Sequence, residues 1–295
     1  MYGDRPNREG NIVPNGVNLD PRTVAGFGRE WGRFDQSKFV GAEYDEIFDA
    51  YFQIFPFEDL PDGAEGFDLG CGSGRWAAGV APRVGKLHCI DPAKEALDVA
   101  RSRLAPAGNV SFHLAAAEAI PLRDGSQDFG YALGVLHHIP DPARALADAV
   151  RKLKPGAPFL LYIYYKLENR PRWYRALWRA SDAMRRVICR TPFAVRMAVT
   201  SSIAALVYWP LARTARLIER FTGDASHFPL SGYRNLSFYS MRTDALDRFG
   251  TSLEHRFSRN DIEEMMTKSG LVDIRFRDSA PYWVACGRRA HSHRR

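Results

Sequence analysis

The sequence has few cysteines, and they form no recognisable pattern. The four are Cys71, Cys89, Cys189 and Cys286, with no C-x-x-C pair and no histidine at metal-ligand spacing beside them. We therefore expect neither a disulfide framework nor a zinc site. The absence of a disulfide framework favours a reducing, cytoplasmic location.

A long hydrophobic run is also missing from the beginning of the chain. Residues 1–16 are polar and rich in Gly, Pro and Asn, without an apolar stretch of signal-peptide length. We interpret residues 1–16 as a mobile arm, the first part of an N-terminal segment that extends to residue 40.

Acidic residues are scarce in one segment. Between Lys166 and Arg220 there are twelve Lys or Arg and three Asp or Glu, whereas the whole chain carries a net charge of +7. This segment also contains fifteen consecutive uncharged residues, 198–212, which Pro210 interrupts. The run is too short to span a bilayer. Three interpretations stay open: a lid over a bulky apolar substrate, a basic surface on anionic lipid, and a dimer interface or solvated face.

The chain does contain a regular alternation of strand and helix patterns. From 41 to 165, short apolar runs such as 66–70 and 86–91 alternate with amphipathic stretches, which predicts a parallel sheet with helices on both faces. Residues 166–240 read as a helical, basic and aromatic insertion. Residues 241–295 predict a helix and an antiparallel edge hairpin that complete the sheet. Nucleic acid is a disfavoured partner, because the basic segment contains no recognised binding module.

Three glycines stand at every second position in EGFDLGCGSGRW, residues 65–76. Glycine allows positive φ and a close approach of the backbone to a ligand. The spacing is G-x-G-x-G and position 75 is Arg, which departs from the dinucleotide fingerprint. A nucleoside without phosphates fits better: Asp68 is suited to a cationic amine, and Asp91, at the end of the next strand, to both ribose hydroxyls.

Five motifs in register extend this pattern: DLGCGSG, CIDP, AAEAIP, LGVLHHI and RKLKPGA. In their order and spacing they resemble class I S-adenosylmethionine-dependent methyltransferases, in the type 11-like branch that acts on small molecules. The resemblance covers about residues 60–165. It implies an α/β fold, a Rossmann-like doubly wound and mostly parallel seven-stranded sheet with a C-terminal antiparallel hairpin and a helical lid insertion.

The resemblance also implies a set of cofactor-binding residues. They are Asp68, Gly70, Cys71, Gly72, Gly74, Asp91, Pro92, Ala117, Glu118 and Gly134. The first part of the set would face the methionine portion of S-adenosylmethionine, Asp91 the ribose, and Ala117 with Glu118 the adenine. Many relatives carry Asp two residues before that Glu, whereas this chain has Ala116. Adenine contacts there would have to come from backbone amides or a neighbouring residue.

The N-terminal segment, residues 1–40, contains AGFGREWGRFD at 25–35. This stretch resembles a segment that folds over the cofactor in many such enzymes. The resemblance implies that Trp31 and Phe34 form a wall of the pocket and that Glu30 or Arg33 binds a polar end. Ordinary aromatic packing of an arm on the domain is the alternative.

Methyl transfer from a sulfonium needs alignment and exclusion of water, and a base only where the nucleophile carries a proton. No metal is required. His137 and His138 follow a strand at its carboxyl end, where open α/β sheets bind ligands, and His255 is a weaker rival. If the acceptor is an alkene carbon, aromatic faces such as Trp31, Tyr233 or Tyr239 would stabilise the cation instead.

The sequence therefore predicts a cytoplasmic methyltransferase that uses S-adenosyl-L-methionine to modify a small, hydrophobic metabolite at O, N or C. Two alternatives stay open: a non-catalytic cofactor-binding homologue with an assembly or regulatory role, and a lipid or quinone methyltransferase that contacts the membrane peripherally through its lid. The acceptor atom and the oligomeric state are not predicted.

Overall fold

A seven-stranded sheet forms the centre of the computed structural model, which describes residues 18–34, 40–225 and 228–291. Of the N-terminal segment expected over residues 1–40, residues 1–17 and 35–39 lie outside the described residues. The strand order is β3-β2-β1-β4-β5-β7-β6. The strands are β1 (Glu65–Leu69), β2 (Lys86–Asp91), β3 (Val110–Leu114), β4 (Phe129–Leu133), β5 (Pro158–Tyr162), β6 (Leu271–Phe276) and β7 (Val284–Arg289).

Strands β1 to β5 pair in parallel, and β7 joins β5 antiparallel with β6 at the edge. The order reverses between β1 and β4, which is the point where doubly wound sheets bind ligands. The predicted fold class, with its C-terminal antiparallel pair, is confirmed.

Side chains of successive strand residues alternate between two apolar layers. Phe67 and Leu69 pack into the layer under α5 and α10, whereas Tyr131 and Leu160 pack into the layer under α2, α3 and α4. The core helices are α1 (Pro21–Arg33), α2 (Ala42–Phe52), α3 (Ala77–Val80), α4 (Lys94–Arg103), α5 (Pro142–Lys152) and α10 (Arg259–Lys268). Helix α3 is short, because the chain tightens to a 3₁₀ turn at Ala81–Arg83.

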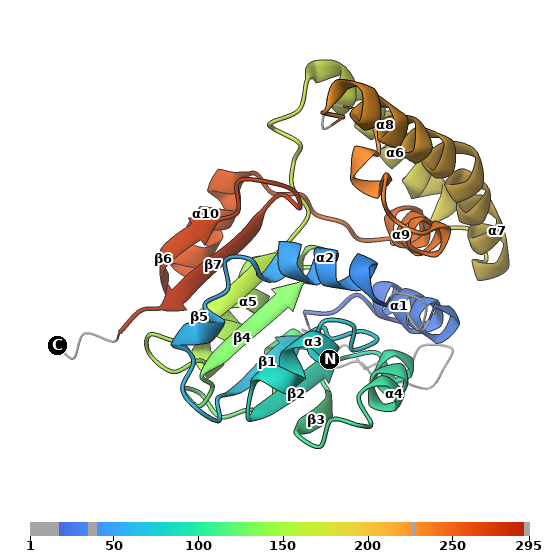
Figure 1. Ribbon diagram of the computed structural model, residues 1–295. Coiled ribbons are helices and arrows are strands. Elements are labelled where there is room, and N and C mark those ends of the chain that lie inside the picture. The colour runs from blue at the N-terminus through green and yellow to red at the C-terminus, as the bar shows by residue number, and fades with distance from the viewer. Residues whose placement is uncertain (1–17, 35–39, 226–227, 292–295) are drawn as a thin grey trace, which may run out of the picture.

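Four further helices form a lid, which Figure 1 shows on one side of the sheet beyond α1 and α2. They are α6 (Arg172–Ile188), α7 (Phe193–Ile203), α8 (Trp209–Thr222) and α9 (Phe238–Gly250). Their small core joins Ile188 of α6, Ala204 and Tyr208, and Met241 and Phe249 of α9. The expected lid boundary at residue 240 falls inside α9.

Pro210 does not interrupt the apolar helix of the lid, which corrects the expectation from sequence. A π-helical turn at Ala204–Tyr208 precedes Pro210. This wider turn changes the hydrogen-bond register, so the proline, which has no N–H, fits within the helix. Helix Phe193–Thr222 is therefore continuous over 30 residues, long and apolar enough by length and composition to cross a membrane. The core helix of a soluble protein can be equally long and apolar, but such a helix is mostly buried. Only 17% of the most apolar 18-residue stretch of this helix is buried.

Candidate functional site

The glycine loop follows β1 at the carboxyl edge of the sheet. Gly70, Gly72 and Gly74 all have positive φ, at 74°, 54° and 72°, which residues with a Cβ rarely adopt. A Cβ on Gly70 would lie 2.4 Å from the side chain of Val135, and one on Gly72 would lie 3.2 Å from Nε1 of Trp31. The loop therefore lies tightly between the turn after β4 and helix α1. Glycine is required at these positions because the backbone has positive φ and because a side chain would have little room.

Asp91 ends β2 beside this loop, and its carboxylate is held in place by the backbone. Its Oδ2 accepts a hydrogen bond from the Gly72 N–H at 2.9 Å, and its Oδ1 accepts one from the Ala93 N–H at 2.8 Å. Burial raises the pKa of Asp91 to about 6, although these two hydrogen bonds oppose the rise. Asp91 lines the cavity together with Gly70, Cys71, Gly72 and Pro92.

Asp68 lies beneath the loop and is not among the residues that line the cavity. This position differs from the direct contact with a ligand amine that the sequence suggested. Its side chain is 1% exposed. Burial raises its pKa to about 8, while the nearby Tyr131 hydroxyl lowers it. The Oδ2 of Asp68 has no hydrogen-bond partner among the described residues. Gly74 also lies outside the cavity lining, against Leu104 and Ala100.

Some of the remaining residues expected to bind the cofactor line the cavity and others do not. Ala117 and Gly134 line the cavity, but Glu118 does not. The Oε1 of Glu118 accepts a hydrogen bond from the Asn18 N–H at 2.7 Å. Asn18 also exchanges hydrogen bonds with the backbone of Asp141, both at 2.7 Å. Glu118 thus fastens the segment before α1 to the core, a role that the sequence did not suggest.

The two histidines occupy the short turn Leu136–His138, and only His138 lines the cavity. Its Nδ1 lies 2.7 Å from the carbonyl of Leu253, an acceptor, so Nδ1 carries the proton and Nε2 has a free lone pair. Nε2 has no hydrogen-bond partner among the described residues and lies 3.8 Å from Oδ1 of Asp247. Burial lowers the pKa of His138, which keeps it neutral near pH 7.

His137 is fully buried away from the cavity. Its ring stacks on Tyr164 with centroids 3.9 Å apart, and its carbonyl accepts a hydrogen bond from the His255 N–H at 2.8 Å. Neither His137 nor His255 is among the residues that line the cavity. The rings of His137 and His138 lie 4.0 Å apart, but of the three histidines only His138 lines the ligand space.

Of the three aromatic residues expected at the substrate, Trp31 and Tyr233 line the cavity. Tyr239 does not, and its ring lies edge-on to Phe34 at 5.7 Å. Phe34 is buried and also lies outside the lining.

Glu30 of helix α1 lines the cavity. Its Oε1 has no hydrogen-bond partner within the described part of the chain. Burial raises the pKa of Glu30 well above its usual range, and the negative charges of Asp247 and Asp244 raise it further.

Sequence reasoning missed the contribution of α9, which brings Asp244 and Asp247 to the cavity. Burial raises the pKa of Asp244 to about 6. Asp247 accepts a hydrogen bond from the Tyr164 hydroxyl at 2.7 Å. The two carboxylates are three residues apart and so share one helix face. Only that spacing, D-x-x-D in a helical pattern, was available as a signal.

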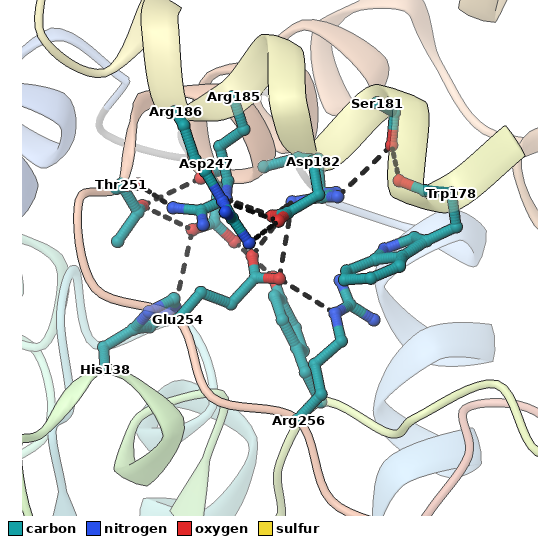
Figure 2. Close-up of polar contacts among 12 residues, drawn as sticks. His138, Trp178, Ser181, Asp182, Arg185, Arg186, Asp247, Thr251, Glu254 and Arg256 are labelled. Atoms are coloured by element: carbon teal, nitrogen blue, oxygen red, sulfur yellow. Dashed lines mark hydrogen bonds and ion pairs between the residues drawn. The ribbon is translucent and has the colours of Figure 1, made fainter. Parts of the chain in front are cut away.

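One cavity of about 1210 Å³ joins all these groups. The glycine loop and Asp91 lie at the sheet, whereas Tyr208, Tyr233 and Asp244 reach it from the lid. Figure 2 shows His138 and Asp247 where the turn after β4 meets α9. The cavity is larger than a typical single-ligand pocket. It is large enough for a nucleoside and a second molecule, with the buried imidazole of His138 in its wall.

The sequence profile of a methyltransferase domain matches residues 67–161. An O-methyltransferase from Penicillium expansum is 37% identical over 98 residues, which are 32% of this chain and 36% of that protein. An uncharacterised methyltransferase from Mycobacterium tuberculosis is 34% identical over 131 residues, 43% of this chain and 52% of that protein. Against three further curated relatives the chain spans only 31% to 41% of their length.

Solved structures extend the likeness to most of the fold. An O-methyltransferase family protein from Burkholderia thailandensis has a TM-score of 0.52 at 15% identity, with 92% of this chain and 61% of that chain covered. A carbon methyltransferase named CurJ has a TM-score of 0.53 at 13% identity, with 92% and 62% covered. At these identities the likeness concerns the fold alone.

Proposed function

We propose that this chain, which contains a class I S-adenosylmethionine-dependent methyltransferase domain, transfers a methyl group to a small molecule bound between that domain and the lid. The observation that carries the proposal is the single cavity, in which the glycine loop and Asp91 face the lid residues Tyr233 and Asp244. A cofactor site alone would not need the second half of this space.

The residues at the sheet fit the nucleoside of S-adenosylmethionine. The positive φ of Gly72 leaves the backbone bare, and Asp91 presents a buried carboxylate already held by two backbone N–H groups. That carboxylate retains acceptor capacity for a ribose diol. Trp31 lies over Gly72 and excludes water from this end. When bound, the cofactor supplies an activated methyl group on a sulfonium.

His138 is the residue that we assign to proton removal. His138 lines the cavity, and its unprotonated Nε2 is buried with no hydrogen-bond partner among the described groups. We propose that this nitrogen accepts a proton from a hydroxyl or amine acceptor when one is bound. The imidazolium that forms lies 3.8 Å from Asp247, which stabilises the positive charge. This arrangement favours a heteroatom as acceptor over an alkene carbon.

The lid end of the cavity favours an acceptor with a largely apolar body. Seven tyrosines line the cavity, namely Tyr51, Tyr162, Tyr164, Tyr165, Tyr208, Tyr233 and Tyr282. Their rings provide apolar and π surface, and Asp244 and Asp247 provide polar contacts beside them. The acceptor that suits these walls is an aromatic or otherwise hydrophobic molecule with one hydroxyl or amine. Membrane contact is a separate proposal, because it concerns the outer surface.

Calorimetric titration with S-adenosylhomocysteine tests the cofactor site. Gly72→Val should abolish binding, because it places a branched side chain at φ 54° against Trp31. Asp91→Ala should weaken binding by about 1 to 3 kcal/mol, the scale of a hydrogen bond to a charged group. Asp98→Ala, at an exposed α4 carboxylate, is the matched control and should leave affinity unchanged. Equal affinity in all four proteins would refute this placement.

A transfer assay separates an enzyme from a non-catalytic binder. The protein is incubated with a methyl donor labelled in its methyl group and a small-molecule extract. A labelled low-molecular-weight product that diminishes strongly in His138→Ala supports catalysis. Cofactor binding without any labelled product would favour the assembly or regulatory alternative.

A further inference from the structure

Helix α6 presents its apolar side to solvent. Trp173, Leu177, Met184 and Val187 are 53%, 53%, 52% and 66% exposed. Their spacing places them along one stripe of the helix. The charged pair Asp182 and Arg185 lies on the opposite side, and each of the two is 6% exposed. Helices of soluble proteins normally bury the apolar stripe and expose the charges, so α6 is inverted.

The buried side of α6 is fixed by a polar network, which Figure 2 shows between α6, α9 and the segment after α9. Asp182 Oδ1 accepts a hydrogen bond from Arg185 Nε at 2.8 Å, and Arg185 Nη1 donates to the carbonyl of Thr251 at 2.8 Å. Rotating α6 to bury its apolar stripe would break this network and leave charges without partners. The stripe therefore stays on the outside.

The continuous helix 193–222 adds apolar side chains to the same part of the molecule. Leu206, Leu217 and Phe221 are 77%, 56% and 79% exposed. Its other side packs through Ala204, Tyr208 and Ala212 into the lid core, which α6 and α9 share. Figure 1 shows α6, α7 and α8 on the side of the lid that faces away from the sheet. We call the exposed side of these helices the outer lid face.

Positive charge accompanies the apolar side chains on the outer lid face. The exposed arginines are Arg172, Arg179, Arg186, Arg190, Arg216 and Arg220. Residues 172–222 contain only two acids, and both are paired: Asp182 inside the network and Glu219 with Arg234 at 2.7 Å. A second copy docking face to face would bring these arginines together, because a two-fold interface pairs a surface with itself. The charge instead complements an anionic surface.

We propose that the outer lid face docks on an anionic lipid bilayer, with the apolar stripe of α6 and the side chains of α7–α8 in the headgroup boundary. The arginines then lie at the level of the lipid phosphates. The helix 193–222 lies along the interface and does not cross it, because its inner side is part of the lid core. This inference is independent of methyl transfer, since it concerns a surface outside the cavity.

Flotation with vesicles tests the proposal on the whole protein. Binding to vesicles of equimolar phosphatidylcholine and phosphatidylglycerol should exceed binding to pure phosphatidylcholine and should fall as salt rises. Arg179→Glu combined with Arg190→Glu should reduce partitioning roughly twentyfold or more, since each arginine near the surface contributes about fivefold. Arg123→Glu, an exposed arginine remote from the lid, is the matched control and should have little effect.

The apolar contribution needs its own variants. Leu177→Glu and Met184→Glu should each reduce binding to the anionic vesicles, whereas Val272→Glu on the edge strand β6 should not. Calorimetry with S-adenosylhomocysteine confirms that each variant is folded. Equal binding to both vesicle types, or wild-type binding by the α6 variants, would overturn the proposal. So would a lipid-free dimer, seen by sedimentation, that Leu177→Glu dissociates, because the face would then belong to a second copy.

Discussion

Asp68 shows at the scale of one residue how burial changes the meaning of a motif. The sequence places an acid before the glycines, where a charge would attract a cationic amine. The structure buries this carboxyl beside Tyr131 and raises its pKa to about 8. Near pH 7 it is largely protonated, and it is a neutral buried group at the end of β1 instead of a charge that attracts an amine.

Asp68→Asn should therefore change how stability depends on pH. The folded wild type retains a proton at Asp68 that the unfolded chain has lost, so its free energy of unfolding falls as pH rises from about 4 to about 8. Asparagine cannot ionise, and the variant should gain about 1 to 3 kcal/mol on wild type between about pH 5 and pH 8. Urea unfolding at both pH values measures this. Parallel pH profiles for the two proteins would contradict it, and Asp98→Asn is the exposed control.

His138 offers a second test at this scale. Its pKa lies below the usual 6.5 because burial outweighs the attraction of Asp247, which raises the pKa. Asp247→Asn should therefore lower the pKa of His138 further, and the acid limb of any transfer rate that needs the neutral imidazole should move to lower pH. NMR titration of the imidazole resonances measures the shift. An unchanged or higher pKa in the variant would show that Asp247 does not act on His138.

At the scale of secondary structure, the sequence predicted elements that depend on local interactions and missed those that depend on contacts between distant residues. The strand before Gly70 and the turn at Gly72 could be predicted because period and glycine spacing are local signals. The position of α9 at the cavity could not be predicted. Asp244 and Asp247 lie more than 150 residues after the glycine loop in the sequence, and only tertiary packing brings them to the same cavity. For α6, the period predicts an apolar stripe, but only tertiary contacts decide which side faces inward.

Glu254 connects the lid helices to the core, and its removal should loosen the lid first. Its carboxylate is 2% exposed, with Oε2 3.1 Å from Arg248 Nη1 and Oε1 2.8 Å from Arg256 Nε. Glu254→Ala should cost about 3 to 5 kcal/mol, because two guanidinium groups lose a buried partner. Limited proteolysis should show faster cleavage within 166–222, and urea unfolding gives the free energy.

The matched control for that experiment is Glu264→Ala, which removes an exposed ion pair with Lys268 on α10. Such surface pairs contribute less than about 1 kcal/mol. Equal destabilisation by the two substitutions, or protease resistance of the lid in Glu254→Ala, would show that the buried network does not hold α6 in place.

At the scale of the whole molecule, the segment before α1 and α1 itself join parts that are far apart in sequence. Asn18 is hydrogen-bonded to Glu118 and Asp141, and Thr23 to Ser252 at 3.0 Å, while Trp31 covers the glycine loop. If a nucleoside binds at Asp91 as we propose, helix α1 would lie across it, and any movement of α1 that exchange requires would have to break these contacts with distant parts of the chain. The frequency of that movement would then set an upper limit on turnover, and tighter contacts would lengthen the time for which the spent product stays bound.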